Sequence, residues 1–295
     1  MKKHIFNFLK GICIGIANVI PGFSGGTMAV MVKIYDLFVY AFANIFNDFK
    51  NVVKKCWSLF LGIGVGILLA LVTIVKLLEI IPFITIMFFV GLIIGSIPSI
   101  YKKSSNGKIK IIDIICFILA IAIMIVLPFI QTNNDPSKTY NFSIFIIMFL
   151  MGIICSSSMV IPGVSGSLVL MAFGYYAFFM STFKELLVNL FNFSLENYWN
   201  KLGVIACFAI GCVLGIVFIS KLITKLTQKH PKTVYVTILG LLIASIFSVI
   251  YSSFTEYTIT FNIPTIIFSI ISLLLGMSLV FIGEYLSKKI ENKEN

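Results

Sequence analysis

The sequence predicts an all-α polytopic membrane protein with two inverted-topology repeats, each a re-entrant or broken helix hairpin plus three transmembrane helices. Three observations predict this fold class. The 295 residues are 59% hydrophobic and 11% charged, with a mean hydropathy of +1.08, whereas roughly 25% of the residues of a soluble domain are charged. The string IPGFSGGT at 20–27 returns as IPGVSGSL at 161–168. Lysines also gather on one side of the predicted spans.

Each half is expected to begin with an apolar segment, a Pro-Gly-x-Ser-Gly elbow and a second segment. Proline removes a backbone donor and glycine weakens a helix, so a break at membrane depth needs protein or water around it. The first segment has only 16 residues, roughly 24 Å of helix against a hydrocarbon core of about 30 Å, so it can enter the bilayer and turn back. Its counterpart is long enough to cross. The expected segments are 5–20, 27–46, 57–78, 80–100 and 109–130, then 142–161, 168–191, 202–223, 234–250 and 264–282.

The second half repeats the first at nearly constant spacing. Around the elbows the matching residues are 141 apart, as in Pro21 and Pro162 or Ser24 and Ser165. Farther on they are 149 apart, as in Pro82 and Pro231. Such agreement with one insertion indicates a duplication. We therefore expect one membrane domain over 1–295, with repeat 1 at 1–135 and repeat 2 at 140–290.

The lysine distribution predicts the orientation of the chain. Each repeat crosses the membrane an odd number of times whether or not its hairpin spans, so the second copy is inverted relative to the first. With the N-terminus inside, 17 of the 22 lysines lie on the inner face. Because cytoplasmic loops carry the excess of cations, we expect a multi-pass cell-membrane protein whose N-terminus and C-terminus are both cytoplasmic.

The two elbows are candidate anion sites. Ser24 and Ser165 stand where a helix N-cap belongs, and the amides that follow would be unpaired donors near a positive helix end. The alternative is that the elbow residues only form tight hairpins and close helix packing. The substrate-binding candidates here are Ser24, Gly25, Gly26, Thr27, Ser165, Gly166 and Ser167, and the structural elbow residues are Pro21, Gly22, Pro162 and Gly163.

Three further polar residues join the candidate substrate site. Lys33 and Asp36 are three apart on the segment after the first elbow, so on one helix they would share a face and neutralise each other. The alternative is a lysine whose charge reaches the membrane surface from a short helix. Asn18 would supply polar lining before the first elbow. Six cysteines without CxxC spacing predict no metal site, and no cofactor is expected.

Composition also limits the function classes. The chain has no arginine, so lysines, hydroxyls or backbone amides must hold any phosphate. A membrane undecaprenyl-pyrophosphate phosphatase would need converging acid, histidine and arginine side chains, which the predicted spans do not offer, so no enzyme is expected. An anion channel or exchanger with paired helix N-termini is an open alternative.

Around the first elbow the chain resembles the bacterial polyprenyl-phosphate transporters, a family formerly grouped as a domain of unknown function. The resemblance lies in a pattern close to A-N-x-I-P-G-x-S-G-G-T, present from Ala17 to Thr27, followed by Ile34, Tyr35 and Asp36; Lys33 departs from it. It implies a flippase that returns undecaprenyl phosphate from the outer to the inner leaflet for peptidoglycan and teichoic acid synthesis. The expected partners are this lipid and membrane lipids, without nucleic acid; proton or ion coupling and a homodimer are left open.

Overall fold

The computed structural model describes residues 2–19, 24–105, 108–129, 140–162, 165–192, 197–259 and 261–294. Throughout these ranges the regular structure is helical, without a strand. The helices of the first half are α1 (Lys2–Val19), α2 (Gly25–Met31), α3 (Tyr35–Ala43), α4 (Phe49–Ile80), α5 (Pro82–Ser104) and α6 (Ile111–Val126), with a 3₁₀ turn η1 (Leu127–Phe129). Those of the second half are α7 (Phe142–Val160), α8 (Gly166–Ala172), α9 (Tyr176–Asn192), α10 (Tyr198–Lys229), α11 (Pro231–Glu256) and α12 (Ile263–Glu294).

Two long helix pairs meet through glycines at matching positions. α1 packs along α4, and α7 packs along α10. A β-carbon on Gly62 of α4 would overlap the carbonyl oxygen of Phe8, and one on Gly211 of α10 would overlap that of Phe149. Only glycine lets two helix backbones approach so closely. Phe8 and Phe149 are 141 residues apart, and Gly62 and Gly211 are 149 residues apart, so the two contacts follow the spacings of the repeat.

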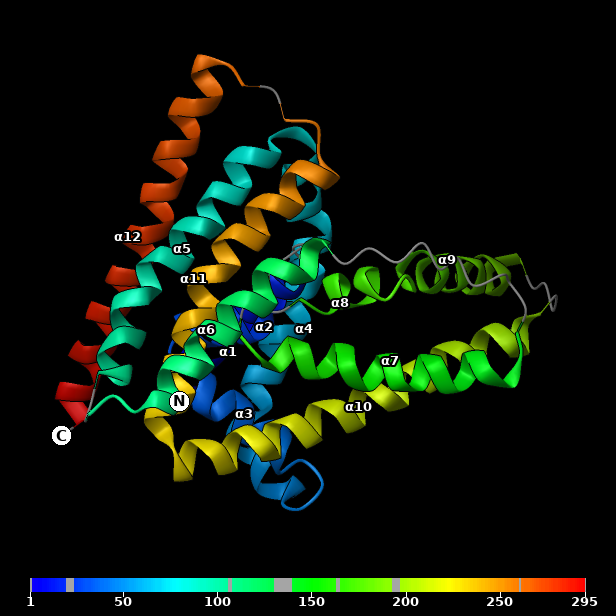
Figure 1. The fold of residues 1–295 in the computed structure, drawn as a ribbon, viewed down its shortest axis with the longest axis horizontal. Helices are drawn as coiled ribbons and strands as arrows, with labels where there is room; N and C mark the ends of the chain where they lie inside the picture. The colour runs from blue at the N-terminus through cyan, green and yellow to red at the C-terminus, as the bar shows by residue number, and fades with distance from the viewer. Residues whose placement is uncertain are drawn as a thin grey trace.

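The last helix of each half packs against a helix of the other half. α5 packs against α12 of the other half, and α11 packs against α6. Gly91 of α5 meets the backbone of Leu273, and its counterpart Gly240 of α11 meets that of Phe117. α5, α11 and α12 lie side by side in Figure 1, with the start of α1 and the end of α12 on the same side of the molecule.

Each segment after an elbow is split in two, contrary to the continuous segments expected over 27–46 and 168–191. The chain leaves α2 through Lys33, whose φ is 54°, and leaves α8 through Gly174, whose φ is 77°. The amides of Lys33 and Ile34 donate to Val30 and Ala29 at 3.1 and 2.9 Å. The counterparts of these bonds exist after α8. This is the Schellman ending, in which a left-handed residue closes the helix, so a new helix must start.

Six described helices are long and apolar enough to cross a membrane. They are Phe49–Ala70, Pro82–Ser104, Phe142–Val160, Tyr198–Lys229, Pro231–Thr255 and Ile263–Ile282. α6 is shorter than the predicted span 109–130, because its α-helix ends at Val126 before the 3₁₀ turn that contains Pro128. Its 16 residues cover roughly 24 Å.

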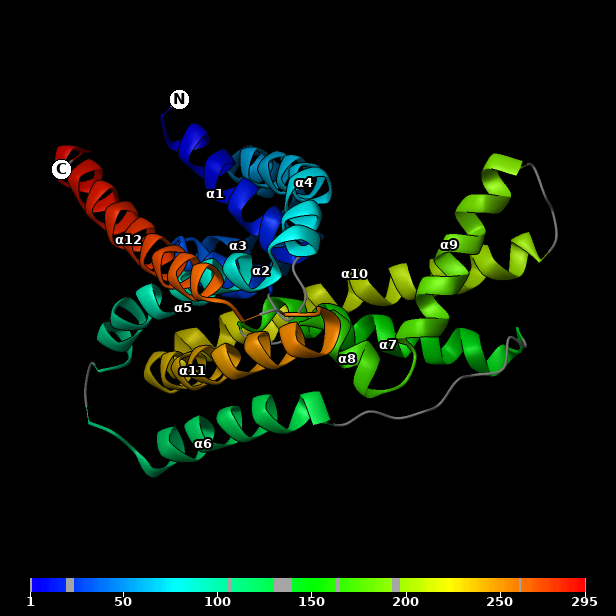
Figure 2. The same cartoon turned by 90° about the horizontal axis from the view of Figure 1, so that it is seen from above.

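The largest core cluster of the described residues includes α2, where all seven residues are buried. Its short sequence GGTMAVM consists mostly of small and unbranched side chains, which lets α1, α5 and α7 pack around it. The two halves differ beyond this point. α9 packs on α10 of its own half, while α3 crosses to α10 of the other half. In Figure 2, α7, α10 and α9 extend away from the bundle of α1 and α4.

Candidate functional site

The first elbow is closed by its own side chains. Ser24 is the N-cap of α2, as predicted, and its Oγ accepts the amide of Thr27 at 3.1 Å and lies 2.9 Å from the Thr27 hydroxyl. Asn18 accepts the amide of Gly25 at 3.1 Å and donates to the carbonyl of Ile14 at 3.0 Å. The expectation of unpaired amides at Gly25 and Thr27 is therefore wrong, because neighbouring side chains of the same hairpin satisfy them. Pro21 and Gly22 lie outside the described residues.

The second elbow has the same backbone position but another bonding pattern. Ser165 precedes α8, yet it does not cap the helix with its side chain. Its hydroxyl lies 2.7 Å from that of Ser167. The predicted N-cap position of Ser165 is thus confirmed, but its hydroxyl bonds to Ser167 instead of a helix amide. Gly166 packs next to the backbone of Cys155, and Gly163 lies outside the described residues.

The two elbows meet in the interior. The Ser24 hydroxyl donates to the carbonyl of Ile161 at 3.5 Å, and Gly26 lies so close to Met159 and Val160 that a β-carbon would meet their carbonyl oxygens. Ser24 and Thr27 are each 1% exposed. The first elbow is therefore enclosed by the end of α7.

A pocket of about 570 Å³ begins at the second elbow and runs between α10, α11 and α6. Ile161 and Pro162 belong to its lining. Most of the wall is aliphatic and comes from α10 and α11: Ile219, Leu222, Ile223, Leu226, Val234, Ile238 and Leu241. The polar lining residues are Tyr35, Lys110, His230, Thr233 and Thr237. The wall from Thr233 to Leu241 spans about 12 Å of helix, and the one lysine among the described lining residues, Lys110, lies at the Thr233 end.

Asp113 joins two walls of this pocket. Its carboxylate accepts the backbone amide of Lys110 at 2.8 Å and the hydroxyl of Thr233 at 2.6 Å. The side chain is buried, so these bonds fix the start of α6 against α11. We call the end of the pocket formed by Lys110, His230 and Thr233 the mouth.

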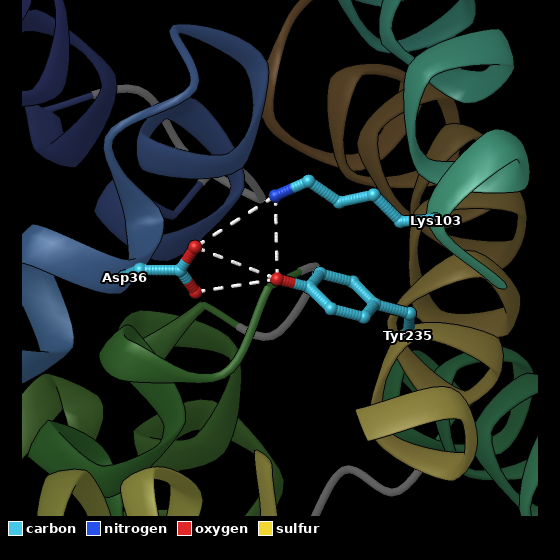
Figure 3. Close-up of polar contacts among 3 residues, drawn as sticks. All are labelled: Asp36, Lys103 and Tyr235. Carbon is cyan, nitrogen blue, oxygen red and sulfur yellow. Dashed lines mark hydrogen bonds and ion pairs between the residues drawn. The ribbon is translucent and has the colours of Figure 1, made fainter. Parts of the chain in front are cut away.

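A polar cluster lies beside the mouth, where α3, α5 and α11 come together (Figure 3). Lys103 Nζ is 3.7 Å from Asp36 Oδ2 and donates to the Tyr235 hydroxyl at 3.2 Å. Tyr235 donates to the two carboxylate oxygens of Asp36 at 3.3 and 3.5 Å. The predicted sharing of one helix face by Lys33 and Asp36 is wrong, because Lys33 lies in the turn before α3.

The structure thus brings together some of the predicted candidates and adds others. Asn18, Ser24, Gly25 and Thr27 form one hydrogen-bonded unit, and Gly26 packs against α7. Ser165 and Ser167 bond to each other at the start of α8, and Gly166 packs next to Cys155 of α7. Sequence reasoning missed Lys103 and Tyr235, which meet Asp36 only through helix packing. It also missed the mouth residues, which line the pocket. The hydrophobic pattern gives no signal for such pairs.

Comparisons with known proteins agree with the resemblance at the first elbow. A family model described as undecaprenyl phosphate translocase-like matches residues 14–266. A polyprenyl-phosphate transporter of Staphylococcus aureus is 31% identical over 92% of this chain and 95% of its own length. A polyprenyl-phosphate transporter of Vibrio cholerae is 25% identical over 83% of this chain and 77% of its own length. No solved structure matches.

The family and both relatives are named for transport and not for an enzyme. The six long apolar helices agree with a multi-pass membrane protein. A family match across most of the chain, together with a relative above 30% identity over nearly its whole length, shows common descent. The chain belongs to the undecaprenyl phosphate translocase-like family of membrane transporters.

Proposed function

We propose that this protein transports undecaprenyl phosphate, or a related polyprenyl phosphate, from the outer to the inner leaflet of the cytoplasmic membrane. In this role it is a flippase that recycles the lipid carrier of peptidoglycan and teichoic acid precursors. The names of the two relatives support the substrate class. The observation that carries the proposal is the aliphatic pocket with a cationic mouth.

The chemistry of the pocket suits a lipid with an anionic head group. A polyprenyl phosphate has an apolar branched tail and one phosphate, so a carrier must offer an apolar surface and, at one end, donors for the phosphate. The aliphatic walls from α10 and α11 offer the first, and Lys110 and His230 at the mouth offer the second. Since the chain lacks arginine, lysine is the cation available for that contact.

The lysine distribution and the duplication support a path that reaches both leaflets. The mouth is built from the ends of helices whose flanking lysines are predicted to be cytoplasmic, so the pocket in this structure would open toward the inner leaflet. In an inverted repeat, an exchange of conformations between the two halves would open the equivalent space to the outer leaflet. The matching glycine contacts of α1 with α4 and of α7 with α10 support such equivalent halves.

Depletion of the protein tests the proposal. Together with any redundant transporter, the protein is depleted from growing cells, and polyprenyl phosphate at the cell surface is measured with a head-group-binding antibiotic. Surface carrier lipid should rise and should fall again after re-expression of this chain. An unchanged surface level would contradict the proposal. Chloride flux in liposomes without lipid movement would instead establish the anion channel.

A further inference from the structure

We propose that Lys103 and Tyr235 form a binding site for the phosphate monoester head group, and that Asp36 occupies this site in the substrate-free protein. The inference rests on the proposed function and adds a site to it. It concerns the cluster of Figure 3, which lies outside the pocket lining.

The two donors already hold one oxyanion. The Lys103 ammonium and the Tyr235 hydroxyl converge on the carboxylate of Asp36, and the ammonium also lies 4.8 Å from the centre of the Tyr235 ring. A carboxylate and a phosphate monoester accept hydrogen bonds from the same donors. A phosphate carries close to two negative charges at neutral pH, where a carboxylate carries one, so it is the stronger partner for an ammonium.

Asp36 is held loosely enough to be displaced. Its side chain is 66% exposed and that of Lys103 is 46% exposed. An ion pair with this exposure and a separation of 3.7 Å contributes little to stability, because water screens it. An arriving phosphate therefore loses little when it replaces the carboxylate.

The cluster is placed where a substrate leaving the pocket would meet it. Tyr35 and Val234 line the pocket, and they are the chain neighbours of Asp36 and Tyr235. Lys103 lies in the last turn of α5, and Tyr235 lies in the first turns of α11, near Thr233 at the mouth. The tail can thus lie in the pocket while the head group reaches Lys103 around the start of α11.

Displacement of Asp36 would also change the packing of the helices. The cluster links α3 to the ends of α5 and α11, and in the described residues these are helices of both halves. Once phosphate takes the two donors, this polar link of α3 to α5 and α11 is lost, while α3 keeps its packing on α10.

Binding of farnesyl phosphate, a short-chain analogue, to the purified protein in nanodiscs tests the site, with farnesol as the uncharged control. Asp36→Asn should raise the affinity for farnesyl phosphate about fivefold, because a competing charge is removed. Lys103→Met should lower it about tenfold, and Tyr235→Phe should lower it less. Lys102→Met, a matched change of the neighbouring exposed lysine, should leave it unchanged. In the double variant Asp36→Asn with Lys103→Met, the gain from Asp36→Asn should be lost.

Each outcome decides between the proposals. If the wild type prefers farnesyl phosphate to farnesol and Lys103→Met keeps that preference, the site proposal is wrong and the transport proposal stands. If Asp36→Asn weakens or does not change binding in folded protein, Asp36 is no competitor and the site proposal is wrong. A wild type without preference for farnesyl phosphate over farnesol contradicts polyprenyl phosphate as the substrate.

Discussion

Ser24 and Ser165 hold the same position in the two halves but make different hydrogen bonds. Ser24 caps α2 through the amide of Thr27, and both residues are almost completely buried. Ser165 bonds instead to the hydroxyl of Ser167 and leaves the start of α8 without a side-chain cap. The first serine therefore stabilises its elbow through a helix amide, whereas the second bonds to a neighbouring hydroxyl.

Ser24→Ala should lower the free energy of unfolding by about 1 kcal/mol, because a buried cap is lost. Ser165→Ala is the matched control and should lower it by less. Thermal unfolding of the two detergent-solubilised variants measures the difference. Equal losses would show that the capping bond of Ser24 contributes no more to the free energy of unfolding than the hydrogen bond of Ser165.

At the scale of helices, glycines decide which elements pair. Gly62 and Gly66 of α4 face α1, and a β-carbon at either one would overlap backbone atoms of α1. Gly64, on the same helix, has no atom within 4 Å of its would-be β-carbon. The same helix thus carries glycines that are required for packing and one that is not.

Gly62→Ala should destabilise the protein by about 1 to 3 kcal/mol, because the new methyl group forces α1 away from α4. Gly64→Ala should instead be neutral or stabilise by up to about 1 kcal/mol, since alanine is the better helix former and the position is open. Unfolding of both variants in the same detergent tests this pair. A similar response of the two would show that α1 and α4 are not held by this close contact.

At the scale of the whole molecule, a pocket, its cationic mouth and the Asp36 cluster gather where helices of both halves end. Cys116 of α6 lines the pocket, whereas Cys207 of α10 does not. Both cysteines are partly buried and carry no disulfide. A larger side chain at Cys116 would therefore fill the pocket without a change at the mouth, and the same change at Cys207 would leave the pocket open.

Cys116→Trp should reduce transport at normal protein abundance, because the indole occupies space that the lipid tail needs. Cys207→Trp is the control and should retain transport. Surface carrier lipid in depleted cells that express each variant gives the measurement. Full activity of Cys116→Trp would exclude the pocket from the transport path.

The orientation of the chain is open to a separate test. Fluorescent-protein and alkaline-phosphatase fusions at the C-terminus should be fluorescent and inactive, respectively, because the lysine distribution predicts a cytoplasmic end. An active phosphatase fusion would reverse the predicted topology. It would then reverse the proposed direction in which the pocket opens as well.

The sequence predicted much of this architecture because helix period and apolar length are local properties. The expected spans 80–100 and 234–250 fall within or close to α5 and α11, and the cap position of Ser24 was predicted from neighbouring residues. The breaks at Lys33 and Gly174 were both missed, although a glycine, unlike a lysine, adopts the left-handed conformation easily. The inverted orientation of the second copy and the roles of the elbow residues stay predictions.

By itself, the sequence determined that this is a helical membrane protein with a repeated elbow and, through its motif, the family to which it belongs. Only the tertiary structure decided that Asp36 meets Lys103 and Tyr235, and that Lys110 and His230 border an aliphatic pocket. The physical reason is that hydropathy and capping act over a few residues, whereas these contacts depend on how helices far apart in the chain pack.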